Sequence, residues 1–237
     1  MSQTAVMETG LASNGSMPET PAGTSPDDAG HNSKSRQIFD GAREVFLSSG
    51  FDGASMNDVA RAAGVSKGTL YVYFDSKERL FEALIRFDRA RQAEQLCQFD
   101  PHDHDVRAVL RRFGTELLDM MTRPAHIAHL RTVVAVAAKF PQIGRAFFEA
   151  GPAVAIARLS AYLAAQVESG QLAIADPVIA AQQFLELCKA GTYMRVLFGV
   201  SGQPTLPDII ASVDRGLDAF LKIYAAPQQG GGAAARA

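Results

Sequence analysis

The stretch SMNDVARAAGVSKGTLYVYF, residues 55–74, limits the possible folds of this chain more than any other. Ser55 is placed to cap a short helix, with Asp58 three residues on as in a short capping box, and that helix ends at Gly64. After the tight turn GVS, Ser66 can cap a second short helix that runs to about Phe74. Two short helices that meet at a steep angle through a glycine-containing turn form a helix-turn-helix.

The apolar residues of this stretch suit the packing of such a motif. Ala60 is small, so the second helix can approach the first, and Gly64 tolerates positive φ. At about 100° per residue, one side of the second helix carries Ser66, Leu70 and Phe74 and is expected to be buried. The shared core is predicted to consist of Val59, Ala63, Val65, Leu70 and Phe74.

The opposite side of the second helix has one charge and otherwise small or planar groups, which is unusual for a merely solvated face but suits a DNA major groove. Its members are Lys67, Gly68, Thr69, Tyr71 and Val72. Lys67 can reach a phosphate or a guanine, and Thr69 can donate its hydroxyl or contact a thymine methyl. Gly68 costs about 1 kcal/mol against Ala inside a helix, but without a Cβ it lets the helix come close to DNA.

Further contacts to the DNA backbone are predicted at the edges of this face. Tyr71 and Tyr73 can hydrogen-bond phosphates. Lys77, in the first turn of the next helix, adds a cation and helix-terminal N–H groups. Structural roles stay open for three residues: Gly68 could relieve crowding against the first helix, Tyr73 could pack at the edge of the core, and Lys67 could be a solvated lysine.

These motifs carry a resemblance to a known family. Residues 36–81, with the stretch IFDGAREVFLSSGFDGASMNDVARAAGVSKGTLYVYFDSKERLF, resemble the DNA-binding domain of the TetR family of bacterial repressors. The stretch FPQIGRAFFEAGPAVAIARLSAYLAAQVESGQLAIADPVIAAQQFLELCKAG is similar to the C-terminal domain of AefR-like members. Val72 stands where the family often has Arg, His or Tyr.

The resemblance implies a homodimer that places two recognition helices on a palindromic DNA operator. It also implies a C-terminal domain that binds a small-molecule effector, whose binding relieves repression. We expect no cofactor. The DNA-binding residues that it implies, together with those derived above, are Ser55, Asn57, Ser66, Lys67, Gly68, Thr69, Tyr71, Val72, Tyr73 and Lys77.

The rest of the chain has helical periodicity, which predicts an all-α fold. Residues 1–33 and 226–237 are expected to be disordered tails, because they have few large apolar side chains to bury. Between them we expect a DNA-binding domain over 34–80 and a helical ligand-binding and dimerisation domain over 81–225. Helices are predicted over 36–50, 55–64, 66–74, 77–97, 103–122, 125–138, 142–150, 152–169, 176–198 and 207–225.

Charge and composition reduce the number of function classes that fit this chain. A net charge of −2 argues against a generic polyanion binder, although residues 34–91 hold ten basic and eight acidic side chains. Two cysteines make no disulfide framework, and no signal peptide or apolar run of 18 residues is present, so we expect a cytoplasmic protein. Phosphate-binding loops, nucleophile elbows and paired catalytic carboxylates are absent, so we expect no enzyme.

The C-terminal half offers weaker candidates for a ligand pocket and a dimer interface. Polar groups inside apolar patterns are candidate pocket residues, with core or interface packing as the alternative for each: Arg131, Tyr162, Cys188 and Tyr193. The last helix repeats apolar residues at steps of four and three, which suits either a seam within the chain or a twofold dimer interface. The candidate interface residues are Ile210, Val213, Leu217 and Phe220.

Three further interpretations stay open at this point. The segment DPHDHD at 100–105 suggests a metal through His102 and His104, but a loop that caps the next helix explains it as well, and no metal site is predicted. Cys97 and Cys188 are either buried thiols or a redox switch. A nucleoid-type DNA-binding protein without a ligand, or a helical protein-interaction module, competes with a gated regulator, whose moving element we expect to be the helix 77–97.

Overall fold

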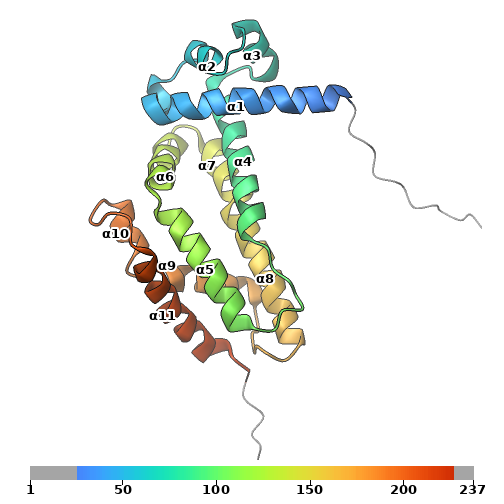
Figure 1. Cartoon of the computed structure of the whole chain (residues 1–237), viewed down its shortest axis with the longest axis vertical. Coiled ribbons are helices and arrows are strands. Elements are labelled where there is room, and N and C mark those ends of the chain that lie inside the picture. The colour runs from blue at the N-terminus through green and yellow to red at the C-terminus, as the bar shows by residue number, and fades with distance from the viewer. Residues whose placement is uncertain (1–25, 227–237) are drawn as a thin grey trace, which may run out of the picture.

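The computed structural model describes the backbone of residues 26–226 and the side chains of residues 33–226. The described residues form eleven α-helices (Figure 1), and their β pairing is limited to one isolated antiparallel bridge between Leu172 and Ala225. The predicted all-α fold is confirmed. The helices are α1 (Pro26–Gly53), α2 (Met56–Ala62), α3 (Lys67–Tyr73), α4 (Lys77–Leu96), α5 (Val106–Thr122), α6 (Pro124–Ala137), α7 (Pro141–Ala150), α8 (Pro152–Glu168), α9 (Pro177–Lys189), α10 (Tyr193–Leu197) and α11 (Leu206–Tyr224).

Two helix boundaries differ from the sequence-based predictions. The predicted helix 176–198 is divided into α9 and α10, because Gly191 has a φ of 77° and a helix cannot continue through that conformation. Helix α1 begins at Pro26, so residues 26–33 are helical and not part of a disordered tail; adding turns to an existing helix costs little. Gly50, the predicted stop, breaks α1 with φ 69° and ψ 178°.

The two predicted tails overlap little with the described part of the chain. Residues 1–25 and 227–237 lie outside the described residues, so the predicted disorder there stays a prediction. Ala226 is described, and its backbone N–H donates to the carbonyl of Gln171 over 3.1 Å.

The molecule has a head, formed by α1–α3 and the start of α4, and a body, formed by the rest of α4 and α5–α11. In Figure 1, α1 lies across the top, α2 and α3 sit above it, and α4 runs down into the bundle formed by α5–α11. A first apolar core joins α1–α4 to residues of α6 and α7, among them Val133, Val136, Ile143 and Ala146. A second core joins the end of α4 to α5, α6 and α8–α11. The head therefore rests on α6 and α7, and the first core includes residues on both sides of the predicted domain boundary at residue 80, which stays a prediction.

Two glycines allow pairs of helices to come into backbone contact. A Cβ on Gly41 would lie 2.4 Å from the backbone nitrogen of Ala63, so α1 and α2 can touch only because position 41 has no side chain. A Cβ on Gly216 would lie 2.8 Å from the carbonyl carbon of Leu187, where α11 crosses α9. Neither close approach is predicted by the residue pattern of the sequence.

The periodic face of α11 is used inside the protomer. Val213, Leu217 and Phe220 have no exposed surface and belong to the second core, where α11 packs on α5 and α9. The prediction that these three residues form a dimer interface is wrong, because the chain's own helices already cover them. Ile210 is half-buried and keeps some surface outside this seam.

Candidate nucleic-acid interface and ligand cavity

The two short helices of the head are set by local capping, as the sequence predicts. Ser55 accepts a hydrogen bond from the N–H of Asp58 over 3.2 Å, and its hydroxyl donates to the Asp58 carboxylate over 2.5 Å. That second bond holds the pKa of Asp58 below its usual value. Ser66 accepts from the N–H of Thr69 over 2.9 Å and so starts α3. Gly64 has a φ of 63°, which turns the chain between the helices.

Helix α3 has one buried side and one open side. Leu70 is fully buried in the first core, whereas Val72 is 79% exposed and Tyr71 is 44% exposed. Lys67 is exposed, with its Nζ 5.8 Å from the centre of the Tyr71 ring. The chain therefore presents the face that the sequence analysis assigned to a major groove.

Gly68 lies in the middle of that face with ample room around it. Apart from its own helix backbone, a Cβ at this position would meet, of the described atoms, only the Ser66 Oγ, at 3.8 Å. Crowding against α2 therefore does not explain this glycine. Its φ is not in the left-handed region either, so nothing within the described protomer requires glycine here.

Several of the predicted site residues are occupied within the motif. The hydroxyls of Ser66 and Thr69 lie 2.7 Å apart, and Ser55 caps α2. Tyr73 is half-buried and packs against the first core, with its ring 6.4 Å from that of Phe74. Asn57 is exposed near the start of α2.

Lys77 does not lie free at the surface as predicted. Its Nζ donates to the carbonyls of Phe51 (2.7 Å), Ala54 (3.1 Å) and Asp52 (3.4 Å), and lies 4.6 Å from the centre of the Phe51 ring. A lysine ammonium has three donors, and their acceptors here are two residues at the end of α1 and Ala54 directly after it. The Lys77 Nζ thus fastens the start of α4 to the end of α1 and is not free for a phosphate, whereas the predicted contact through the helix-terminal N–H groups stays a prediction.

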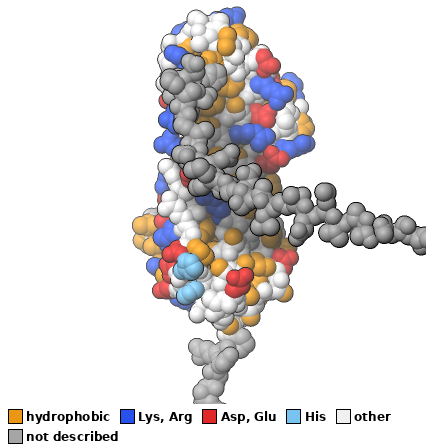
Figure 2. Space-filling model, turned by 90° about the vertical axis from the view of Figure 1, so that its right-hand side faces the viewer, with side chains coloured by type: hydrophobic (Ala, Val, Ile, Leu, Met, Phe, Trp, Pro, Cys, Tyr) orange, Lys and Arg blue, Asp and Glu red, His pale blue; other side chains and the backbone are white. Residues whose placement is uncertain are grey.

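The charge around the head is mixed in sign. Arg61 pairs with Asp58 over 3.2 Å, and Arg79 lies 3.4 Å from Glu82. Figure 2 shows basic and acidic side chains side by side on the upper half of the face in view, with hydrophobic side chains on both halves. Uniform positive charge is therefore not what distinguishes the head.

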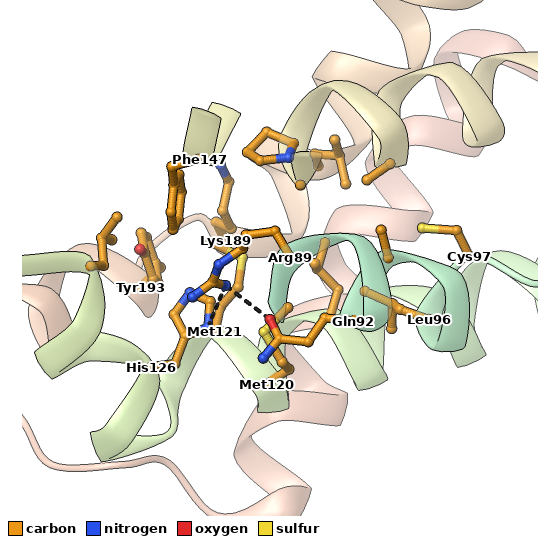
Figure 3. A pocket seen from close by; sticks show the side chains of 17 residues that line it. Arg89, Gln92, Leu96, Cys97, Met120, Met121, His126, Phe147, Lys189 and Tyr193 are labelled. Carbon is orange, nitrogen blue, oxygen red and sulfur yellow. Dashed lines mark hydrogen bonds between the residues drawn. The ribbon is translucent and has the colours of Figure 1, made fainter. Parts of the chain in front are cut away.

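A cavity of about 170 Å³ lies in the body beside the second half of α4. Apolar side chains from α4 to α9 form most of its wall, among them Leu96, Met120, Met121, Leu130, Phe147 and Leu185. Its polar groups are Arg89, Gln92, His126, Lys189 and Tyr193 (Figure 3). A concave, mostly apolar site with a few polar groups is typical of small-molecule binding.

Of the four predicted pocket residues, only Tyr193 lines this cavity. Arg131 is exposed and its Nε donates to the Leu197 carbonyl over 3.0 Å, at the end of α10. Tyr162 is 2% exposed and donates to the Asp103 carbonyl over 2.9 Å. Cys188 is fully buried in the second core. These three residues satisfy their polar groups or pack within the chain, and they are not part of the cavity.

The residue that the sequence analysis missed is Arg89. It is 6% exposed, its Nη1 donates to the Gln92 side chain over 2.9 Å and lies 3.3 Å from the His126 Nδ1, and its guanidinium lies 4.5 Å from the centre of the Phe147 ring. Burial lowers its pKa to about 10, and burial together with Arg89 lowers the pKa of His126 to about 3. The signal was present, because Arg89 follows Ile85 by four residues on the inward side of α4.

The structure also describes the segment at 100–105 and the two cysteines, whose roles the sequence left open. Asp105 caps α5 by accepting from the N–H of Ala108 over 3.0 Å, and the His104 Nδ1 lies 2.9 Å from the Gln166 side-chain oxygen. Within residues 33–226, no three His, Cys, Asp or Glu side chains gather in a way that could hold a metal ion. Cys97 and Cys188 are both buried, and burial raises their pKa values to about 11 and about 12.

No helix among the described residues combines the length and the apolar character that crossing a membrane requires.

Family profiles match both parts of the chain. The profile of bacterial regulatory proteins of the tetR family matches residues 38–84. The profile of the AefR-like transcriptional repressor C-terminal domain matches residues 108–226, which is just over half of the 237 residues.

Individual relatives agree with these profiles. The transcriptional repressor AcnR of Corynebacterium glutamicum is 30% identical over 169 residues, which are 70% of this chain and 83% of AcnR. The match to AcnR of Corynebacterium efficiens is 40% identical but spans only 27% of this chain and 34% of that protein.

Solved structures share the fold over most of their length. A putative TetR-family regulator from Mesorhizobium loti superposes with a TM-score of 0.75 at 25% identity, over 82% of this chain and 98% of that one. The flavonoid-responsive regulator FrrA superposes with a TM-score of 0.72 at 32% identity, over 83% of this chain and 99% of FrrA.

Proposed function

We propose the following function for this chain, which belongs to the TetR family of bacterial regulatory proteins. It is a DNA-binding transcriptional repressor of that family, with an AefR-like C-terminal domain, and not an enzyme. We further propose that it binds a palindromic operator as a homodimer and that a small molecule in the body's cavity releases it.

Helix α3 is the proposed recognition helix, and the single observation that carries this assignment is the open surroundings of Gly68. Because nothing described in the protomer needs a glycine there, we assign its role to close approach to base pairs. Its neighbours on the open face, Lys67, Thr69, Tyr71 and Val72, then contact base edges and phosphates. We propose that Asn57 and Tyr73 touch the DNA backbone, and that Ser55, Ser66 and Lys77 position the motif.

The operator geometry follows from the size of one motif. A single helix-turn-helix reads only a few base pairs, and two of them must sit about 34–36 Å apart to enter successive major grooves. A dimer supplies that spacing. Because the periodic face of α11 is used internally, we propose that the dimer contact uses exposed apolar side chains of α9 and α11 instead. The candidates are Val178, Ile179, Leu206 and Ile223.

The cavity is the proposed effector site. A dry protein cavity of about 150 Å³ holds a benzene-sized molecule, so about 170 Å³ suits an aromatic ring or a short aliphatic chain with a small substituent. The relative FrrA is named flavonoid-responsive, which supports a ring-containing ligand for this chain too. A ligand lowers operator affinity only by its differential affinity for the DNA-bound and released conformations.

The test begins with selection of operator DNA from a random pool by the purified chain. Fluorescence anisotropy at fixed salt concentration then compares the wild type with Tyr71→Ala and with the control Phe148→Ala, which removes an aromatic ring that is 55% exposed on α7. Tyr71→Ala should weaken binding about tenfold, and Phe148→Ala should leave it unchanged. Equal affinity of all three proteins for the selected DNA would remove Tyr71 from the interface.

The gating part has a separate readout. Candidate effectors are titrated into the protein–operator complex, and release of DNA is expected for a ligand that occupies the cavity. If cavity ligands bind without any change in operator affinity, the chain is a DNA-binding protein without ligand control. Weak sequence preference with a steep salt dependence would instead favour a nucleoid-type protein.

A further inference from the structure

Among the described residues that line the cavity there are two cations, Arg89 and Lys189, and no Asp or Glu. A buried cation costs free energy unless an anion or a full set of acceptors accompanies it. The cavity therefore carries positive charge that its own wall does not neutralise.

The two cations differ in their partners. The Nζ of Lys189 lies 2.6 Å from a carboxylate oxygen of Glu186, so its charge is balanced outside the cavity. The acid next to Arg89 in sequence, Asp88, is taken by Arg43, with contacts of 2.6 and 3.1 Å from α1. Arg89 is thus the cavity cation that has no ion-pair partner in the described part of the chain.

The guanidinium of Arg89 also has an unused donor. It is 94% buried, counting from its 6% exposure, and its Nε has no hydrogen-bond partner among the described residues. Figure 3 shows Arg89, Gln92 and His126 pointing toward one another, with the guanidinium between them. Both neighbours are neutral: Gln92 is an amide, and His126 has a pKa of about 3. They orient the guanidinium without cancelling its charge.

The wall next to Arg89 adds a second feature that favours an anion. Helix α8 starts at the cavity, where Gly151 and Pro152 form part of the wall, and its first turn has no side-chain cap. The N-terminus of a helix carries partial positive charge and free N–H groups. A Cβ on Gly151 would lie 3.3 Å from the Arg89 Cδ, so the glycine leaves room for the arginine to lie against this helix start.

The remainder of the wall has the opposite character. Leucine side chains, Met120, Met121 and the Phe147 ring form it, and methionines adapt their shape to irregular ligands. A ligand that fills this space must be largely apolar and carry its polarity at one end.

Building on the proposed effector site, we infer that the effector is a small amphipathic organic anion whose acidic oxygens accept hydrogen bonds from Arg89. A carboxylate matches the planar fork of a guanidinium. The apolar body of the ligand lies against Met120, Met121 and Phe147. Because Arg89 belongs to α4, the anion binds the helix that leads to the head.

The inference is tested with matched acid and amide pairs: benzoate and benzamide, cinnamate and cinnamamide, octanoate and octanamide. Binding is measured by calorimetry on the full chain. Each acid should bind about tenfold more tightly than its amide, because only the acid forms charge-assisted bonds with Arg89. Amides that bind as well as the acids would overturn the inference, and so would a failure of all three acids to bind.

Three variants identify the residue responsible. Arg89→Met keeps the apolar stem and should reduce the acid-to-amide ratio to about one, whereas Arg89→Lys keeps the charge and should retain part of the preference. Arg86→Met is the matched control on the same helix, and its preference should stay as in the wild type because Arg86 lies outside the cavity wall and pairs with Glu82 and Glu149. An acid preference that survives Arg89→Met or disappears in Arg86→Met contradicts the assignment.

Operator binding separates this inference from the function on which it rests. The same acids are added to the complex of the wild type with selected DNA. Acids that bind through Arg89 but leave DNA bound would refute ligand control and keep the site. DNA release by the neutral amides alone would keep ligand control and refute the anion.

Discussion

Replacement of Gly68 by alanine should change protein stability and operator affinity in opposite directions. The added methyl group has room in the free protein, since the nearest atom outside the helix backbone is the Ser66 Oγ at 3.8 Å. That distance is an ordinary van der Waals contact. The substitution therefore tests whether the glycine serves the fold or an external surface.

The magnitudes follow from helix propensity and packing. Alanine is better than glycine inside a helix by up to about 1 kcal/mol, and part of this gain comes from a less flexible unfolded chain. Against base pairs the same methyl is an overpacked group, which costs about 1–3 kcal/mol. Two recognition helices in a dimer double that cost, and about 2 kcal/mol corresponds to roughly a 30-fold loss of affinity.

The assay pairs urea denaturation with anisotropy titrations on the selected operator. Gly202→Ala is the control, since a Cβ there meets no described atom within 4 Å and the position lies in the loop before α11. This control should leave operator affinity unchanged. Operator affinity within twofold of wild type for Gly68→Ala would refute close approach at α3, and a loss of stability would refute the clearance argument.

Three further substitutions or conditions test the packing and the cavity. Gly41→Ala should destabilise the fold by about 3 kcal/mol in urea denaturation, since its Cβ would lie 2.4 Å from a backbone nitrogen that cannot move alone; a loss below 1 kcal/mol would contradict this. Lys77→Met should lower the free energy of unfolding by about 1–3 kcal/mol, because it removes the donor to three carbonyls. If the variant instead keeps wild-type stability and binds DNA more weakly, the Lys77 side chain contacts a phosphate after all. The free energy of unfolding should fall between pH 7 and pH 5 by up to about 2 kcal/mol for each of His126 and His129, because their pKa values of about 3 and about 4 in the folded protein make the unfolded state bind more protons in this range. The dependence of this free energy on pH should flatten when both residues are replaced by Gln, and an unchanged pH dependence would argue against buried neutral imidazoles.

The head could be predicted in detail from the sequence because its determinants are local. Ser55 and Ser66 cap helices through bonds to residues three positions on, and Gly64 needs only its own φ. The spacing of Leu70 and Val72 fixes which side of α3 is buried. Each of these signals lies within a few residues of its effect, so a single sequence contains it.

The failures concern contacts between distant segments. The spacing of apolar residues indicates which side of α11 is apolar. It does not indicate whether α5 and α9 or a second copy of the chain covers Val213 and Leu217. Lys77 is basic and near the motif, yet the carbonyls that it binds lie at and just after the end of α1, more than twenty residues earlier. Such partners depend on the packing of whole helices, which residue spacing does not encode.

The cavity shows the same limit in another form. A polar residue inside an apolar pattern is a candidate for a pocket, but Tyr162 meets that description and is satisfied by the Asp103 carbonyl. Arg89 meets it equally and is not satisfied, because Asp88 is held by Arg43. Only the positions of the competing partners separate the two residues, and those positions come from the folded chain.

Helix α4 connects the proposed effector site to the proposed DNA interface through rigid geometry. Its first half packs in the head core through Phe81 and Ile85, and its second half carries Arg89 at the cavity. At 1.5 Å per residue, Arg89 lies about 18 Å along the axis from Lys77. A tilt of about 5° at the cavity end would therefore shift the start of α4 by about 1.6 Å.

A shift of this size is enough to matter for a dimer on DNA. Lys77 fastens the start of α4 to the end of α1, and the pair of Arg43 and Asp88 ties α1 to α4 further along, so the head follows the helix. Each protomer would move its recognition helix, so the separation between the two would change by up to about 3 Å. Successive major grooves accept only a spacing near 34–36 Å. An anion that reorients Arg89 can thus act on the operator through α4 without any change in α3 itself.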